Sequence, residues 1–254
     1  MIHPDSPLTN RFREVVGQYS SLERAVQRVY PTFVTGYARF YTWYHFGRRH
    51  RAPIDPLEIL HINPGEIVGK QQHKSEFPHP DPISEVRDGS WDQDYVRIED
   101  HHMFQSFRQH FEGDRQWAET PFYRECIDGI RTGEVKWGCA TIEAFEERLD
   151  TIDGLYEVIA TTGYRSQLEL HQEKDRIARD IHGYWPAPLN EVTTNIGRGG
   201  DFILHDGRHR LFIARLVGIE AIPVRVKARH LEWQTLRDRH AADTIGGGAH
   251  PDLP

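Results

Sequence analysis

The clearest hydrophobic pattern in the C-terminal part of the chain is a strand, a helix and a second strand. Residues 202–205 are apolar, Asp206 and Gly207 interrupt them, and apolar side chains then recur at helical spacing from 211 to 217. Gly218 ends this segment, and IPVRV (222–226) is typical of a buried strand. Because the connection between the two strands has the length of a crossover, we expect them to be neighbours in one sheet.

Upstream of this unit the pattern predicts further strands and helices. Residues 191–205 alternate around RGGD and predict a β-hairpin. A short strand at 57–62 ends at Asn-Pro-Gly, and we interpret 70–95, rich in Pro, His, Asp, Gly and Ser, as a loop. Helices are expected at 99–113, at 118–131 and after Thr141, a good N-cap residue, ending at Gly163.

The N-terminal residues 9–50 form a separate unit with its own pattern. Apolar and aromatic side chains recur at helical spacing, and arginines fill much of the remainder. We expect Pro31 to divide two helices or to start the second one. The chain therefore consists of a basic aromatic helical arm (1–52) and a mixed α/β (α+β) domain (53–254), which carries a helical insertion at about 70–140.

Composition narrows the class of protein. With 38% hydrophobic and 27% charged residues in 254, the chain supports a hydrophobic core and a water-soluble surface. It contains no apolar run of a membrane span or a secretory signal. Its two cysteines form no CxxC pair, so a disulfide framework is not expected. These features favour a cytoplasmic protein.

Charge is distributed unevenly along the chain. Residues 1–52 contain eight Lys/Arg and three Asp/Glu, a net +5, while the whole chain carries −7, which leaves −12 for the remainder. An acidic body argues against a protein that coats nucleic acid. The arm (9–50) either packs on the main domain as an ordinary helix or lies against an anionic membrane or a partner, in which case the protein is membrane-peripheral.

The start of the predicted helix after Gly207 is the strongest candidate site. Arg208, His209 and Arg210 all fall in the first turn, where unpaired backbone N–H groups already create a positive field. A phosphate bound there would accept hydrogen bonds from the turn and from these side chains, and Gly207 would allow close approach. We therefore expect Arg210 to serve the mouth of a site and not the core.

Other arrangements of the same residues are compatible with the sequence. Arg208 and Arg210 could pair with acidic neighbours such as Asp201 or Glu220, and His209 could be a polar cap. Asp206 could bind Mg²⁺ together with phosphates, act as a base, or simply cap the helix.

This strand–DGRHR–helix–LG–IPV unit resembles the ParB/sulfiredoxin-like superfamily, whose signature is a glycine, a variable residue and a His-Arg or Arg-Arg pair that opens a helix. Segments 57–66 and 148–167 are similar to earlier elements of that fold in the expected order, and about 100 residues are covered. The resemblance implies a ParB/sulfiredoxin-like mixed sheet with a nucleotide-phosphate site at Gly207, His209 and Arg210.

Departures from the family pattern select one branch. The sulfiredoxin branch has a cysteine where this chain has Arg208, and the partition branch has a DNA-reading segment for which too few residues follow. The Asp-Gly-x-His-Arg form resembles the small-molecule kinase branch. That resemblance implies a phosphotransferase that uses ATP or ADP with Mg²⁺ and a small polar acceptor, with Asp206 near the transferred group or the metal. The alternatives are a nucleotide-sensing or membrane-associated binding protein without turnover, and a ParB-like DNA binder or nuclease.

Several other residues are weaker candidates for a role in this site. Glu66 could be a general base at the end of the first strand, or a surface carboxylate. Arg165 and Ser166 follow Gly163 and could face the same mouth. Arg229 and His230 end the last strand and either reach that mouth or cap the sheet. The Lys136–Cys139 cluster has no assigned role.

Overall fold

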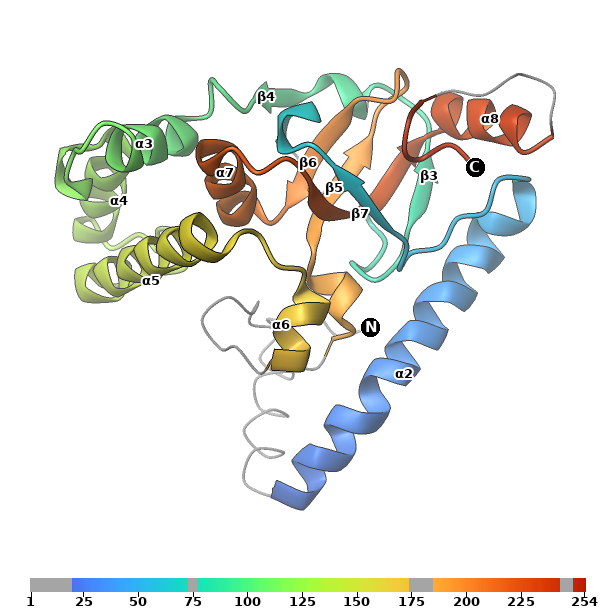
Figure 1. Cartoon of the computed structure of the whole chain (residues 1–254), viewed down its shortest axis with the longest axis horizontal. Helices are drawn as coiled ribbons and strands as arrows, with labels where there is room; N and C mark the ends of the chain where they lie inside the picture. Colours follow the sequence, from blue (N-terminus) through green and yellow to red (C-terminus); the bar gives the residue numbers. More distant parts are fainter. Residues whose placement is uncertain (1–19, 73–76, 174–184, 243–248) are drawn as a thin grey trace.

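The protein is described here from a computed structural model, which covers residues 20–72, 77–173, 185–242 and 249–254. Its centre is one mixed sheet, shown in Figure 1. Seven strands form it, in the order β1-β7-β5-β6-β2-β4, with β3 pairing with β7 beside β1. The strands are β1 (Ile59–Ile62), β2 (Ile67–Gln71), β3 (Glu85–Arg87), β4 (Tyr95–Arg97), β5 (Val192–Ile196), β6 (Phe202–Asp206) and β7 (Ile222–His230).

Helices lie mainly on one side of this sheet. In Figure 1, α3, α4, α5 and α7 gather to the left of the strands, while α8 and α2 lie to the right. The helices of the described residues are α2 (Ser20–His45), α3 (His102–Phe111), α4 (Pro121–Arg131), α5 (Ile142–Thr162), α6 (Gln167–Glu173), α7 (Arg208–Val217) and α8 (Leu231–His240). The predicted α+β class and the helices at 102–111, 121–131 and 142–162 are confirmed, as is the Thr141 N-cap.

The predicted hairpin is confirmed, but the predicted neighbours of β6 are not. Antiparallel pairing joins β5 to β6. Strand β5 also pairs in parallel with β7, so it lies between β6 and β7 and the expectation that these two strands are adjacent was wrong. The physical reason is that β5 uses both of its edges, which places α7 as a connection over one intervening strand.

The helices and one face of the sheet share the main hydrophobic core. Side chains from β5, β6 and β7 pack against Phe107, Phe145 and Phe212 of α3, α5 and α7. A second, smaller cluster around Phe77 and Trp91 covers the opposite face of the sheet. Both faces are therefore buried, which fits the continuously apolar character of 202–204.

Two local predictions were wrong. Helix α2 runs from Ser20 to His45 without a break, and Pro31 lies inside it instead of dividing it. Residues 70–95, interpreted as a loop, contain β3, the start of β4 and the end of β2. The three short strands have few residues each, so their alternation is too brief to distinguish them from a loop in the sequence.

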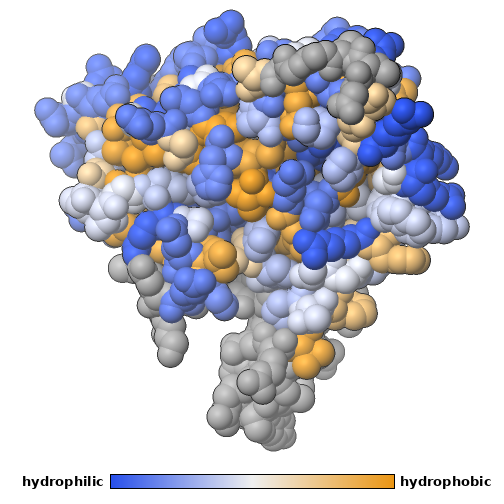
Figure 2. Space-filling view, turned by 45° about the vertical axis from the view of Figure 1, so that its right-hand side comes forward, coloured by the Kyte–Doolittle hydropathy of each residue, from blue (hydrophilic) through white to orange (hydrophobic). Residues whose placement is uncertain are grey.

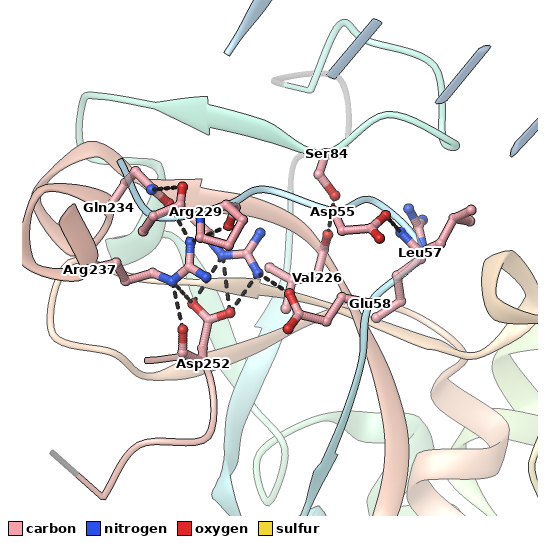
Figure 3. A network of polar contacts seen from close by, with 12 residues as sticks. Asp55, Leu57, Glu58, Ser84, Val226, Arg229, Gln234, Arg237 and Asp252 are labelled. Atoms are coloured by element: carbon pink, nitrogen blue, oxygen red, sulfur yellow. Dashed lines mark hydrogen bonds and ion pairs between the residues drawn. The ribbon is translucent and has the colours of Figure 1, made fainter. Parts of the chain in front are cut away.

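A buried ion network ties the C-terminal residues to the last strand (Figure 3). The Arg229 Nε donates hydrogen bonds to both carboxylate oxygens of Asp252, at 3.1 and 3.0 Å, and Arg237 approaches the same carboxylate at 3.1 Å. The Trp233 indole donates a further bond at 2.8 Å. Arg229 therefore has a structural partner, while His230 caps helix α8 by accepting the Glu232 N–H, a role that the sequence did not predict.

The structure also bears on membrane insertion and on the two cysteines. Among the described residues, no helix combines the length and apolar content that crossing a bilayer requires. Cys126 and Cys139 are both buried free thiols.

Candidate functional site

The start of α7 has the backbone geometry expected for a close approach. Gly207 precedes the helix in the left-handed region, with φ 86°, where a side chain is unfavourable. A Cβ atom placed on Gly207 would lie 3.0 Å from the Val192 Cα, so the turn also packs tightly on β5. Gly218 ends the helix in the same conformation, with φ 76°. The sequence thus located both ends of α7 correctly.

Arg210 lies in the core, contrary to expectation. Its side chain is only 9% exposed and donates a hydrogen bond to the Asn190 carbonyl oxygen. Its Nη1 lies 3.6 Å from Oε2 of Glu191, so the acidic partner is Glu191 and not Asp201 or Glu220. Arg210 therefore connects α7 to the segment that leads into β5.

Glu191 is itself an unusual carboxylate. It is 4% exposed, and its Oε1 accepts the backbone N–H of Gln167. Burial raises the pKa of Glu191 to about 7, although the Arg210 charge acts in the opposite direction. Glu191 thus links α6, β5 and α7, with a protonation state that changes near neutral pH.

His209 is half-buried at the start of α7, and its imidazole is neutral. Burial and the neighbouring Arg208 charge lower the pKa of His209 to about 3. The Trp137 indole N–H donates to His209 Nε2 at 3.2 Å, and the two rings meet edge to face with centroids 4.9 Å apart. A neutral imidazole held in this way contributes no positive charge to an anion site, whereas its sequence position had indicated a part in a positive field.

Trp137 belongs to the cluster whose role the sequence left open. Its backbone has φ 52°, which is unusual for a bulky residue. Lys136 and Cys139 pair through their backbones on either side of it, and the Arg148 guanidinium lies 4.9 Å from the centroid of its ring. The cluster is therefore a tight turn that places an indole against the start of α7.

Arg148 and Arg208 both lie at the contact between Trp137 and His209. The Arg148 guanidinium lies 4.9 Å from the centroid of the Trp137 ring, and Arg208 Nε donates to His209 Nε2 at 3.4 Å. Burial is the main cause that lowers the pKa of Arg208; the Asp206 charge opposes that shift and the Arg148 charge adds to it. Asp206 is therefore the acidic side chain whose charge acts on Arg208.

Asp206 ends β6 in register with residues on the two adjacent strands. Its Cα lies opposite Thr193 on β5, which in turn lies opposite Arg225 on β7. Arg225 is 2% exposed, and burial lowers the pKa of its guanidinium to about 10, while Asp81 and Asp206 oppose that shift. Asp206 itself is exposed at the C-terminal end of β6. It therefore lies between Arg208 on the helix side and Arg225 within the sheet.

The structure places Arg165 and Ser166, which were predicted to face the same site, in two separate roles. Arg165 and Arg210 line one small pocket, together with apolar side chains of α5 and α6 such as Leu155 and Leu170. Ser166 forms a capping box instead: its Oγ accepts the Glu169 N–H at 3.2 Å, and its own N–H donates to the Glu169 carboxylate at 2.7 Å. Ser166 thus starts α6.

Glu66 lies at the other end of the sheet. Strand β2 runs parallel to β6 with Ile67 opposite Phe202, so Glu66 lies one residue before the start of β6, while Asp206 ends it, roughly 16 Å further along at 3.3 Å per residue. The Glu66 carboxylate accepts the Asn63 N–H at 3.3 Å in a capping box. One reaction centre at Asp206 would therefore not include Glu66.

The residues near Asp206 fit a phosphate better than an independent metal ion. Among the described residues, no three His, Cys, Asp or Glu side chains cluster as a metal site would require. Mg²⁺ commonly binds through one or two carboxylates and the oxygens of a phosphate. Asp206 would therefore hold Mg²⁺ only together with a phosphate group bound at α7.

Comparison with known proteins gives no relative: no family model, no curated protein and no solved structure matches the chain. The resemblance to the ParB/sulfiredoxin-like superfamily stays a prediction that rests on the Gly207–Arg210 segment and the order of the elements around it.

Three residues of this site were not found from the sequence. Trp137 lies in the predicted insertion, Arg148 lies in the helix predicted after Thr141, and Glu191 precedes a strand that was interpreted only as part of a hairpin. The one local signal was Trp137 itself, a large ring in a short polar turn that had no other explanation. Arg148 and Glu191 gave no such signal, because the three residues lie 17 to 71 positions from Arg208 in the sequence.

Proposed function

We propose that the N-terminus of α7 binds the phosphate of a nucleotide, and that the protein is a phosphotransferase that uses ATP or ADP and Mg²⁺. The observation that carries the proposal is that two arginines, Arg148 and Arg208, gather at the Trp137–His209 contact beside the start of α7, with Asp206 as the acidic side chain whose charge acts on Arg208. A phosphate would supply the missing negative charge and would also accept N–H bonds from the first turn of the helix.

Asp206 is the residue of this site with a chemical role. Phosphoryl transfer depends on positioning and on cations that stabilise the charge of the transferred group, with a carboxylate that orients or deprotonates the acceptor. Bound Mg²⁺ would neutralise part of the phosphate charge. Arg208 and Arg148 would hold the phosphate, and Asp206, exposed at the end of β6, would accept a proton from a small polar acceptor or contact the metal.

The experiment that tests this function combines binding with turnover. ATP, ADP, CTP and GTP are titrated with and without Mg²⁺ by thermal shift, and nucleotide hydrolysis is followed in parallel for the wild type and Asp206→Asn. The substitution keeps an oxygen that can cap a helix but removes the charge. Retained binding with lost turnover in Asp206→Asn supports the catalytic role, and full turnover in that variant contradicts it. Binding without any turnover would leave the nucleotide-sensing alternative.

A further inference from the structure

Helix α2 has an aromatic face that is exposed in the described part of the chain. Its Val34, Ala38 and Thr42 are buried, and the Thr42 Oγ1 accepts the Ser84 N–H at 3.2 Å, so one side of the helix is anchored to the body. The opposite side carries the exposed side chains Val29 (64%), Tyr30 (38%), Phe33 (64%), Phe40 (63%), Trp43 (56%) and Tyr44 (45%). We call these six residues the α2 aromatic face.

This face concentrates the exposed apolar surface of the molecule. The six residues are two thirds of the nine large hydrophobic side chains that are exposed in the described part of the chain. Figure 2, which brings the α2 side forward, shows pale and orange atoms above the grey ones in its lower centre, and further orange atoms among the blue ones in its upper part. Contiguous exposed apolar surface of this kind marks an interaction site.

Most charges beside the α2 aromatic face are positive, although Asp55 pairs with Arg39 of α2 at 2.9 Å. Residues 25–54 contain five arginines and no Asp, Glu or Lys. Arg48 lies over the Tyr44 ring, 4.4 Å from its centroid, so a guanidinium group is held directly beside the face. With a net +5 for residues 1–52 and −12 for the rest of the chain, the basic charge is confined to the region of α2.

We propose that the α2 aromatic face binds an anionic lipid surface, an interaction separate from the phosphate site at α7. Tyrosine and tryptophan favour the boundary between lipid headgroups and acyl chains, and basic residues beside them attract anionic headgroups. The acidic body is repelled by the same surface, which leaves the α2 side facing the lipid.

Charge complementarity favours lipid over another copy of the protein. Two α2 aromatic faces in contact would bring together two regions of net +5, and like charges oppose that pairing. Contact of the arm of one copy with the acidic body of another would be head-to-tail and would extend into an open assembly. An anionic bilayer relieves the repulsion and covers the whole face.

The test uses the full chain and co-sedimentation with vesicles of phosphatidylcholine, with and without phosphatidylserine. The wild type is expected to bind the phosphatidylserine vesicles about tenfold or more tightly than the neutral ones, and to lose that binding at about 0.5 M salt because screening weakens the attraction. The combined substitution Phe33→Ser, Phe40→Ser and Trp43→Ser is expected to abolish binding. The matched control, Val135→Ser with Leu168→Ser, removes side chains of similar exposure (66% and 53%) outside α2 and is expected to bind like the wild type.

Three results would overturn the proposal. They are no binding to either vesicle by folded wild-type protein, equal binding to neutral and anionic vesicles, and equal loss of binding in the control variant. Light scattering of the vesicle-free protein is measured alongside. A stable dimer that the triple substitution dissociates, without vesicle binding, would assign the α2 aromatic face to a second copy of the chain instead.

Discussion

The indole N–H of Trp137 donates a hydrogen bond to Nε2 of His209 at 3.2 Å. This bond joins a turn in the middle of the chain to the first helical turn of the candidate site. It fixes the neutral imidazole with Nε2 as the acceptor, because a protonated ring could not accept the bond. The turn at 136–139 is therefore part of the structure that positions Arg208.

Trp137→Phe tests the energetic value of that bond. Phenylalanine keeps an aromatic ring but removes the donor, so His209 Nε2 keeps only the longer bond from Arg208 Nε, at 3.4 Å. We expect a loss of about 1 kcal/mol in the free energy of unfolding, measured with urea. Trp43→Phe, at a position 56% exposed on α2, is the control and should change stability little. Equal effects of the two substitutions would show that the bond contributes nothing specific.

Glu191 predicts a pH dependence of stability. Its pKa is raised in the folded state, from 4.5 to about 7, because burial disfavours the charged form. The protonated form is therefore favoured by folding, and this contribution is complete below about pH 4.5 and is lost as pH rises through about 7. Relative to Glu191→Gln, the wild type should lose roughly 3 kcal/mol of unfolding free energy between about pH 5 and pH 8. Parallel pH profiles for the two proteins would exclude the raised pKa.

The main expected effect of substituting Arg210 is a loss of folding stability and not of binding. Arg210→Met leaves the buried Glu191 without its cation, and the loss of one partner of a buried pair costs about 3–5 kcal/mol. Addition of Glu191→Gln to that variant removes the unpaired charge and should restore part of the loss. Urea unfolding of the wild type, both single variants and the double variant measures this coupling. A double variant that is as unstable as the sum of the two single variants would contradict the pairing.

Two glycines allow the close contact at the start of α7 to be measured separately from backbone strain. Gly207 and Gly218 both have positive φ, but a Cβ atom would lie 3.0 Å from Val192 at Gly207 and would contact nothing within 4 Å at Gly218. Gly218→Ala should therefore cost about 1 kcal/mol from backbone strain alone. Gly207→Ala should cost a further 1 kcal/mol or so from displacement of β5. Equal urea midpoints for the two variants would show that β5 does not constrain the turn.

The sequence predicted the elements better than their arrangement. Periodicity and glycine positions located α7, the hairpin and α5, because those signals are local. The position of β5 between β6 and β7 depends on pairing between residues about 30 positions apart, such as Thr193 and Arg225, which no local pattern specifies. Pro31 was given too much weight, since a long helix such as α2 accommodates a proline when its remaining contacts are kept.

The sequence pointed to the start of α7 as a candidate site but not to the way its side chains are arranged. A run of Arg-His-Arg predicts three cations at one mouth, whereas Arg210 turns away into the core and His209 is a neutral acceptor for Arg208 Nε at 3.4 Å. Arg210 reaches Glu191, and His209 reaches Trp137, which leaves Arg208 beside Arg148. The sequence did not predict Glu191, Trp137 and Arg148 as neighbours, because each lies in a different segment of the fold.

Isothermal calorimetry of nucleotide binding to Arg208→Gln tests the account most directly. Arg97→Gln removes the same charge on β4 from a side chain that is 72% exposed and serves as the control. We predict that the wild type and the Arg97 variant bind the preferred nucleotide equally well, and that the folded Arg208 variant loses about 1.5–3 kcal/mol of binding free energy, the value of a hydrogen bond to a charged group. Wild-type protein that binds no nucleotide, or an Arg208 variant with unchanged affinity, would contradict a phosphate site at the start of α7.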